Sequence, residues 1–253
     1  MSSNKILGME ITLGTYRSFV DQIIQLSSTH ESHYVCVANV HMLMEVNRRK
    51  PFATAVNRAA LVTPDGKPLT WALKSLSGIR QDRVAGMDLL PDLLREAASK
   101  SLSVYFYGGT QDMLDKTRKA MSERYPGLII AGMESPPFHY FSRESEDRAI
   151  DRINQSGAAL VFVILGCPKQ EEWMAAMKGT INAVMIGVGG ALPVLIGMQK
   201  RAPDWMQNAG LEWVYRLYQE PRRLFQRYLV TNTGFLFLFF KAYVSGVFRR
   251  KIL

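Results

Sequence analysis

Residues 159–173 read ALVFVILGCPKQEEW, in which seven consecutive apolar residues end at a glycine and a helix-like segment follows. A short apolar run bounded by Gly and Pro is typical of a strand that is buried on both faces of a sheet. Similar runs recur along the chain at Tyr34–Val40, Ala59–Thr63, Ser103–Tyr107, Gly127–Ala131 and Ala183–Gly187. Helix-like segments separate these runs, so we predict an α/β fold with a Rossmann-like, mostly parallel sheet and helices on both faces.

The predicted strands place five loops at one edge of the sheet, because the carboxyl ends of parallel strands lie together and ligands bind there. These loops are Asn39–His41, Pro64–Pro68, Gly108–Thr110, Gly166–Gln170 and Gly187–Gly190. Two of them are rich in glycine, which lets backbone N–H groups approach a phosphate. Neither matches a dinucleotide fingerprint or a P-loop, and tight turns explain both glycine clusters equally well.

Single residues in and near these loops have two interpretations each. Asp65, between Pro64 and Gly66, is either a turn residue or a catalytic carboxylate at the mouth of a cleft. Arg83 precedes a helix-like segment, where it could clamp a phosphate or lie on the surface. Lys169 would stand at a helix N-terminus, which is unfavourable unless an anion lies nearby. Cys167 has no sequence neighbour that would activate it, so we expect a buried residue rather than a nucleophile.

The composition indicates a globular chain with a basic partner-binding segment. The chain has 253 residues, 47% of them hydrophobic, and a formal net charge of +9. Its two cysteines lie in or beside apolar runs, which favours a reducing compartment over a disulfide framework. The four histidines (His30, His33, His41 and His139) are scattered and no CxxC is present, so no metal site is expected. The N-terminus lacks the apolar core of a signal peptide, which predicts a cytoplasmic protein.

The last part of the chain is predicted to be a separate unit, so we divide the chain into an α/β catalytic domain (1–198) and a C-terminal appendage (199–253). From Leu211 onward eight basic and two acidic residues occur, interleaved with aromatic residues, and FLFLFF spans Phe235–Phe240. Such a pattern is typical of helices that lie at an anionic membrane surface. Polar residues interrupt the span Leu229–Phe248, so an interfacial helix pair is favoured over a transmembrane helix. A helix packed on the core and a nucleic-acid site are the alternatives, and no nucleic-acid motif supports the second.

Several longer motifs carry a family resemblance. They are TPDGKPL (63–69), RVAGMDLLPDL (83–93), YFYGGT (105–110), LGCPKQEEWM (165–174) and the block GVGGALPVLIGMQKRAPDWMQNAGLEWVYRLYQEPRRLFQRYL (187–229). With these motifs in this order, the chain resembles the WecG/TagA/CpsF glycosyltransferase family along nearly its whole length. The resemblance implies a membrane-associated, inverting transferase that needs no metal or cofactor. Its expected partners are a UDP-sugar donor, a polyprenyl-diphosphate-linked sugar acceptor and the cytoplasmic face of the plasma membrane.

The resemblance also implies roles for individual residues. Asp65 matches the proposed general base, and His41 is the second candidate because its pKa suits neutral pH. The resemblance implies that Asn39, Arg83 and Gln170 bind the donor and that Arg216 and Arg223 contact the diphosphate. The glycine-rich loops, by their pattern rather than by the resemblance, add the backbone of Gly108, Gly109, Gly187, Gly189 and Gly190 as expected phosphate-binding positions.

One departure from the family pattern affects the expected donor. The family's usual Thr-x-Asn-Pro-Glu is Val37-Ala38-Asn39-Val40-His41 here, so only Asn39 is kept. The resemblance therefore implies N-acetylmannosamine or a related hexose such as glucose as the donor sugar. The alternatives are a non-catalytic, membrane-docked sugar-nucleotide-binding protein and a peripheral nucleic-acid binder. The sequence leaves homo-oligomer formation open.

Overall fold

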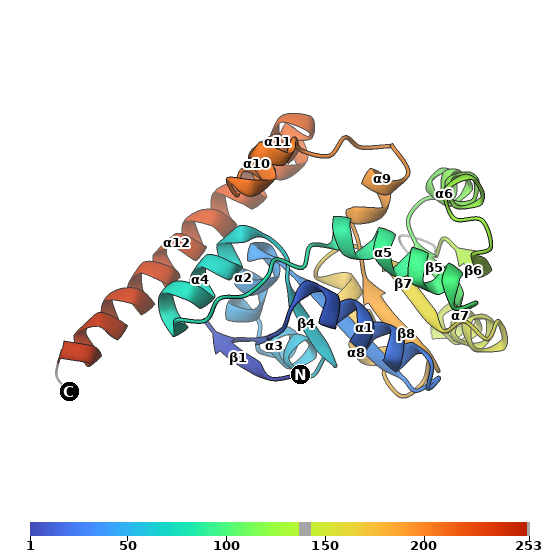
Figure 1. Cartoon of the computed structure of the whole chain (residues 1–253), viewed down its shortest axis with the longest axis horizontal. Coiled ribbons are helices and arrows are strands. Elements are labelled where there is room, and N and C mark those ends of the chain that lie inside the picture. The colour runs from blue at the N-terminus through green and yellow to red at the C-terminus, as the bar shows by residue number, and fades with distance from the viewer. Residues whose placement is uncertain (137–142, 252–253) are drawn as a thin grey trace.

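A six-stranded parallel sheet forms the centre of the part of the chain that the computed structural model describes, residues 1–136 and 143–251. The strand order is β4-β3-β8-β7-β5-β6 (Figure 1). The strands are β3 (His33–Ala38), β4 (Leu61–Pro64), β5 (Ser103–Gly108), β6 (Ile129–Glu134), β7 (Leu160–Ile164) and β8 (Val184–Gly187). The predicted α/β fold with a parallel sheet is therefore confirmed. His139 lies outside the described residues.

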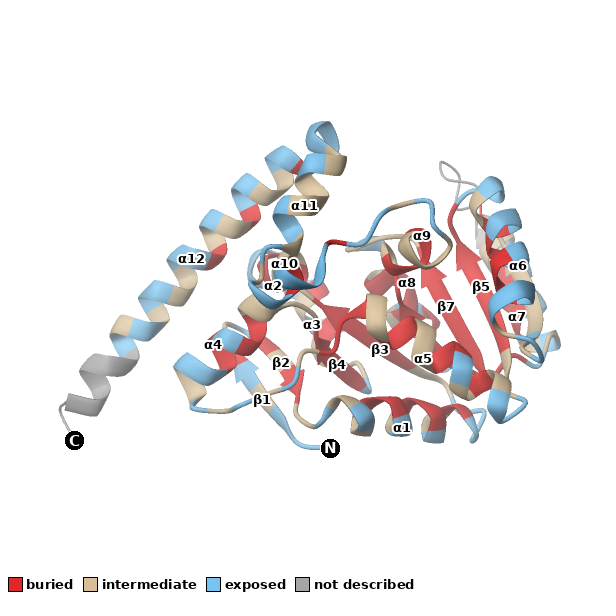
Figure 2. Ribbon diagram, turned by 45° about the horizontal axis from the view of Figure 1, so that its top comes forward, coloured by how far each residue is buried: buried red, intermediate tan, exposed pale blue. Residues whose placement is uncertain are grey.

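Two apolar cores lie on opposite faces of this sheet, because successive side chains of a strand point to opposite faces. Val35 and Val37 of β3 belong to one core, and Tyr34 and Cys36 belong to the other. The first core is covered by α1 (Tyr16–Ser27), α5 (Gly86–Ser99), α6 (Gln111–Arg124) and α9 (Ala191–Leu195). The second is covered by α2 (Val40–Arg48), α3 (Lys50–Asn57), α4 (Lys67–Ser77), α7 (Arg143–Gln155) and α8 (Lys169–Met177). Figure 2 shows the buried strands between these layers.

An N-terminal hairpin of β1 (Ser3–Ile6) and β2 (Met9–Thr12) was not predicted from the sequence. Its two-residue turn, Leu7-Gly8, has positive φ at both positions, as the tight hairpin turns that suit twisted strands require. Leu-Gly lacks the Asn-Gly signature of such turns, which is why the hairpin was missed. The hairpin extends the core beside β4, where the Val62 N–H donates to Thr12 Oγ1 at 2.9 Å.

The predicted boundary of β6 was also displaced. Gly127 lies in a turn with φ +89° and the strand begins at Ile129, two residues later than the apolar run suggested.

The C-terminal segment folds into α10 (Asp204–Asn208), α11 (Glu212–Gln219) and α12 (Pro221–Lys251). The predicted helix pair over Leu229–Phe248 was wrong, because α12 runs through this span without a break. The Thr231 hydroxyl donates to the Arg227 carbonyl at 2.8 Å, and Thr233 donates to Leu229 in the same way. Back-bonding of this kind lets polar residues continue a helix.

Helix α12 lies along the core rather than apart from it. It packs on α2 and α4, and its Phe235 side chain is buried in the core. Gly234 allows the close approach, since a Cβ there would lie 2.6 Å from Met44 Cε. No helix in the described residues combines the length and the apolar character needed to cross a membrane.

Candidate functional site

Asp65 lies where β4 ends, at the edge of the sheet that holds the carboxyl ends of the strands. Its N–H donates to the carbonyl of Ala38, at the end of the neighbouring strand β3, at 2.6 Å. Gly66 follows with φ +98°, a conformation that other residues rarely adopt, and α4 begins at Lys67. This turn holds the Asp65 side chain partly buried at the rim. Asp65 is therefore a turn residue, as one interpretation predicted, and its role as a catalytic carboxylate stays a prediction.

The environment of Asp65 raises the pKa of its carboxyl group to about 7. Burial is the largest cause, because a poorly solvated site disfavours the charged form. The nearby carboxylate of Glu212 raises the pKa further, and Asp88 does so to a smaller extent. The positive charges of Arg83 and Arg216 lower it. A carboxyl with this pKa exchanges a proton readily near neutral pH, as a general base must.

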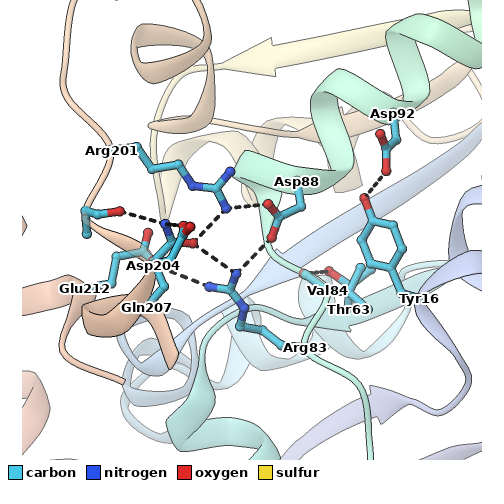
Figure 3. Close-up of polar contacts among 11 residues, drawn as sticks. Tyr16, Thr63, Arg83, Val84, Asp88, Asp92, Arg201, Asp204, Gln207 and Glu212 are labelled. Carbon is cyan, nitrogen blue, oxygen red and sulfur yellow. Dashed lines mark hydrogen bonds and ion pairs between the residues drawn. The ribbon is translucent and has the colours of Figure 1, made fainter. Parts of the chain in front are cut away.

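Arg83 holds the rim and the C-terminal segment together through two carboxylates (Figure 3). Its guanidinium pairs with Asp88 of α5 at 2.9 Å and with Glu212 of α11 at 3.1 Å. Arg201 pairs with the other oxygen of Asp88 and donates to Gln207 Oε1 at 2.9 Å. Gln207 is buried in α10 and donates to the Ala202 carbonyl at 2.6 Å. Two helices of the segment after residue 198 are thus anchored beside Asp65.

Arg216 of α11 reaches the glycine-rich loop that follows β8. A Cβ at Gly190 would lie 2.6 Å from Arg216 Nη2, so the guanidinium rests on the backbone of this loop. Arg216 also lies close enough to Asp65 to lower its pKa. Among the described residues no carboxylate forms an ion pair with Arg216. Its charge therefore faces the rim between Asp65 and Gly190.

Gln170 lies against the same loop at Gly187 and Gly189. A Cβ at Gly187 would lie 2.8 Å from Gln170 Nε2, and a Cβ at Gly189 would lie 3.2 Å from its Oε1. The amide therefore occupies the space that side chains at these two glycines would fill. The expected contact of Gln170 with the donor stays a prediction.

Gly108 and Gly109 have a structural requirement of their own at the end of β5. Their φ values are +111° and +76°. A Cβ at Gly108 would lie 2.6 Å from the Ile164 carbonyl oxygen, and one at Gly109 would lie 2.9 Å from Met113 Sδ. The Gly109 N–H donates to the Ile164 carbonyl at 3.1 Å, so it already has an acceptor. A tight turn explains these glycines without a ligand.

Asn39 lies beside Asp65, because it directly follows Ala38, whose carbonyl accepts from the Asp65 N–H. His41 and Arg223 have other neighbours. The Asn39 side chain caps α2 by accepting from the Met42 N–H at 3.2 Å. His41 lies between the Cys167 backbone and Arg227 of α12, and burial together with Arg227 lowers its pKa. No contact joins His41 to Asp65 in the described part of the chain. Arg223 pairs with Glu220 near the exposed start of α12.

No group of three or more His, Cys, Asp or Glu side chains within residues 1–136 and 143–251 is placed to hold a metal ion.

Comparison with known proteins identifies the family. The family model described as "Glycosyl transferase WecG/TagA/CpsF family" matches residues 4–248. The chain belongs to this family. It is 31% identical over 191 residues to an N-acetylglucosaminyldiphosphoundecaprenol N-acetyl-beta-D-mannosaminyltransferase of Bacillus spizizenii strain W23, covering 75% of this chain and 72% of that protein. It is 26% identical over 222 residues to a protein of the same name from Staphylococcus aureus strain MW2, covering 87% and 85%. The chain is therefore a glycosyltransferase.

The arrangement around Asp65, Arg83 and Gln170 in this WecG/TagA/CpsF glycosyltransferase includes residues that the sequence did not single out. Glu212 and Asp88 set the charge around Asp65 and Arg83, and Gln207 and Arg201 hold the same network. Glu171 holds the amide of Gln170. Glu212, Asp88 and Glu171 all lie inside the motifs that carried the resemblance, but nothing in the sequence says which acidic residues face inward. Burial, which only the fold reveals, is the signal that separates them.

Proposed function

We propose that this glycosyltransferase moves N-acetylmannosamine, or a related hexose such as glucose, from a UDP donor to a sugar on undecaprenyl diphosphate. The observation that supports this most is the partly buried Asp65 carboxyl, whose pKa is about 7, beside Arg216 at the glycine-rich rim. The names of the two relatives indicate the acceptor class and the transferred sugar. A role in cell-surface polysaccharide synthesis follows from such an acceptor.

Asp65 is the proposed general base of an inverting displacement. Its carboxylate takes the proton of the acceptor hydroxyl as that oxygen attacks the anomeric carbon of the donor. The new bond joins this carbon to the acceptor oxygen, and the bond to the UDP oxygen breaks on the opposite face. The electron pair leaves with UDP, and the proton stays on Asp65 until solvent removes it. A raised pKa makes the carboxylate a stronger base than a solvated aspartate.

Arg216 is the strongest candidate to stabilise the departing diphosphate. It lies against the loop Gly187–Gly190, and no carboxylate of the described residues neutralises it. Arg83, by contrast, is held by Asp88 and Glu212, so it carries less free charge. Fixed positive charge placed where negative charge develops lowers the barrier of such reactions. Arg223 is proposed to contact the diphosphate of the acceptor, from its place near the start of α12.

The exposed face of α12 supports attachment to a membrane surface. Phe225, Leu229, Leu236, Phe240 and Tyr243 are exposed and spaced by 4, 7, 4 and 3 residues, so they form one stripe along the helix. Arg222 and Arg223 are exposed near one end of this stripe. Apolar side chains beside basic ones favour the headgroup layer of an anionic membrane. We propose that this stripe holds the enzyme on the cytoplasmic face of the plasma membrane.

Val37 and His41 are proposed to affect which sugar the donor carries. A Cβ at Gly86 would lie 3.5 Å from Val37 Cγ1, so a methyl group lies against the start of α5 where the family's usual threonine would carry its hydroxyl or methyl group. A panel of UDP-sugars, each incubated with a lipid-linked acceptor, identifies the donor by the release of UDP. A preference for UDP-N-acetylmannosamine would indicate transfer of the same sugar as in the relatives' names. A preference for UDP-glucose would indicate that the donor specificity differs from theirs.

Replacement of Asp65 tests the mechanism. Asp65→Asn keeps the shape of the side chain but removes the base, so kcat should fall by about 10²- to 10⁴-fold. The Kd of the UDP-sugar should change little, because the base contacts the acceptor hydroxyl. Asp151→Asn, an exposed change on α7, is the matched control and should keep wild-type activity. Near-wild-type turnover of D65N would reject Asp65 as the base and make His41 the next candidate.

A further inference from the structure

The first turn of α8 directs two polar side chains into the protein. Gln170 is 5% exposed and Glu171 is 0% exposed, whereas the preceding Lys169 lies in solvent. Carboxylates are almost never fully buried without a partner. Burial raises the pKa of Glu171 to about 7, and the Gln170 amide is the largest influence that lowers it. The reaction proposed above leaves this enclosed carboxyl without a role.

Glu171 fixes the orientation of the Gln170 amide. Gln170 Nε2 donates to Glu171 Oε1 at 2.5 Å, which turns the amide nitrogen toward α8. The amide oxygen Oε1 is then directed away from Glu171, toward the loop that follows β8. A Cβ at Gly189 would lie 3.2 Å from this oxygen. Oε1 is buried and has no hydrogen-bond partner among the described residues.

An unpartnered buried acceptor at a binding edge indicates a missing donor. Leaving a buried carbonyl oxygen without a hydrogen bond is unfavourable, and a ligand O–H or N–H removes that cost. An amide presents an oxygen acceptor or two N–H donors depending on its orientation, so a neighbour that fixes the amide selects which one the ligand meets.

We propose that Glu171 is a positioning residue that presents Gln170 Oε1 as a hydrogen-bond acceptor to an O–H or N–H group of the nucleotide-sugar donor. The proposal rests on the proposed function, because it assumes that a UDP-sugar binds at this rim. Two parts of the donor have the same chemistry: a sugar hydroxyl or amide N–H, and the N–H of the uracil ring. Without Glu171 the amide is free to turn and offer N–H groups where the ligand needs an acceptor.

Glu171→Gln tests this role with a side chain of nearly the same shape, because its neutral amide oxygen accepts from Gln170 more weakly than a carboxylate and the new amide can itself turn its N–H groups toward Gln170. The Kd of UDP-N-acetylmannosamine should rise about tenfold, which corresponds to about 1.4 kcal/mol. The KM of the donor should rise with it while kcat stays near the wild-type value, because ground-state and transition-state binding are lost equally. A purely structural role would lower Tm and kcat instead. Titration with UDP alone separates the two sources: weaker UDP binding assigns the contact to uracil, and unchanged UDP binding assigns it to the sugar.

Glu172→Gln is the matched control in the same turn. Glu172 pairs with Arg49 at 2.5 Å at the surface, so its replacement should leave donor affinity unchanged. Gly187→Ala is an independent second variant, because its Cβ would press on Gln170 Nε2 at 2.8 Å and displace the amide; it should weaken donor binding similarly. If E171Q fails to fold, the donor affinity of G187A tests the proposal instead.

The proposal is overturned if folded E171Q or G187A binds the donor as tightly as wild type. It is also overturned if E172Q weakens binding as much as E171Q does. A wild-type protein that binds no UDP-sugar would instead reject the proposed function on which it rests.

Discussion

At the scale of single residues, Asp65 shows how a turn residue acquires an unusual pKa from its surroundings. Pro64 ends the strand and Gly66 supplies the positive φ, so the side chain between them is held at the rim. The same local sequence on an exposed hairpin would leave an ordinary, solvated aspartate. Burial and the charge of Glu212 raise the pKa of Asp65 to about 7, and these come from elements distant in sequence.

The raised pKa predicts that Asp65 reduces stability above neutral pH. An unfolded Asp ionises near pH 3.8 whereas the folded one ionises near pH 7, so the folded state binds the extra proton between these values and stability falls as pH rises through that window. Asp65→Asn should therefore raise the free energy of unfolding at pH 8 by roughly 1–3 kcal/mol, a range discounted because the group is partly exposed. At pH 3 the two proteins should be equally stable.

Thermal or denaturant unfolding at pH 3 and pH 8 measures this difference. Asp151→Asn should show no such dependence on pH, because Asp151 is exposed. Equal stability of D65N and wild type at pH 8 would contradict a raised pKa for Asp65.

At the scale of secondary-structure elements, α12 carries apolar residues on two sides, one packed on the core and one exposed. Leu224, Thr231 and Phe235 are buried on one side of the helix, while Phe225, Leu236 and Phe240 are exposed on another. Apolar residues on two sides explain why the segment resembles a transmembrane helix without having the required length of uninterrupted apolar sequence. Packing on α2 and α4 holds the helix so that the second side stays exposed.

Replacing two residues of the exposed stripe should weaken membrane binding without affecting the core. Leu236 and Phe240 are 61% and 68% exposed. Leu236→Ser with Phe240→Ser should reduce retention on vesicles of equal parts phosphatidylglycerol and phosphatidylcholine by about tenfold or more, because buried apolar area drives interfacial binding. Co-sedimentation measures the loss. Tm should change little.

Ile129→Ser provides the control for this pair, since Ile129 is exposed on the opposite edge strand β6. It should leave vesicle binding unchanged. Full retention of the double variant on the anionic vesicles would reject the stripe as the membrane-facing surface.

At the scale of the whole molecule, the core and the C-terminal segment both contribute residues to the candidate site. The core contributes Asp65 and Arg83, and α11 contributes Glu212 and Arg216. The Arg83–Glu212 ion pair joins the two parts at 3.1 Å (Figure 3). Both parts therefore determine the proton affinity of Asp65.

Glu212→Gln should shift the pH dependence of transfer. If Asp65 is the base, as proposed, it must be deprotonated to act, so the rate should fall as pH falls through its pKa of about 7. Removing the negative charge of Glu212 lowers that pKa and releases Arg83, whose positive charge lowers it further, while Arg216 and Asp88 keep their places. The acid limb of the kcat/KM profile should move to lower pH by up to about one unit.

Glu220→Gln is the control for this shift. Glu220 also lies in the C-terminal segment and pairs with Arg223, but it is not among the charges that affect Asp65. Its profile should match wild type. An unshifted acid limb in E212Q would show that the C-terminal segment does not tune the base.

Much of this protein follows from local sequence alone. The strand-and-helix alternation predicted the parallel sheet because buried strands need uninterrupted apolar runs, and the rim loops followed because parallel strands end together. The motifs that carry the family resemblance also fixed the reaction class. The hairpin β1–β2 was not predicted, because Leu-Gly is a weak turn signal. The continuous α12 was not predicted either, because the threonine hydroxyls donate to backbone carbonyls of the same helix and so do not interrupt it.

Tertiary structure decided which polar residues face inward and which charges meet. Glu212 lies 147 positions after Asp65 in the chain, yet it raises the pKa of Asp65. Glu171 and Glu172 are neighbours in sequence, yet one is enclosed against Gln170 and the other pairs at the surface. The physical reason is that burial and electrostatic fields depend on distances in space. Local sequence sets the conformation of a turn or strand, whereas the packing of distant elements sets the solvation and the charge that each side chain meets.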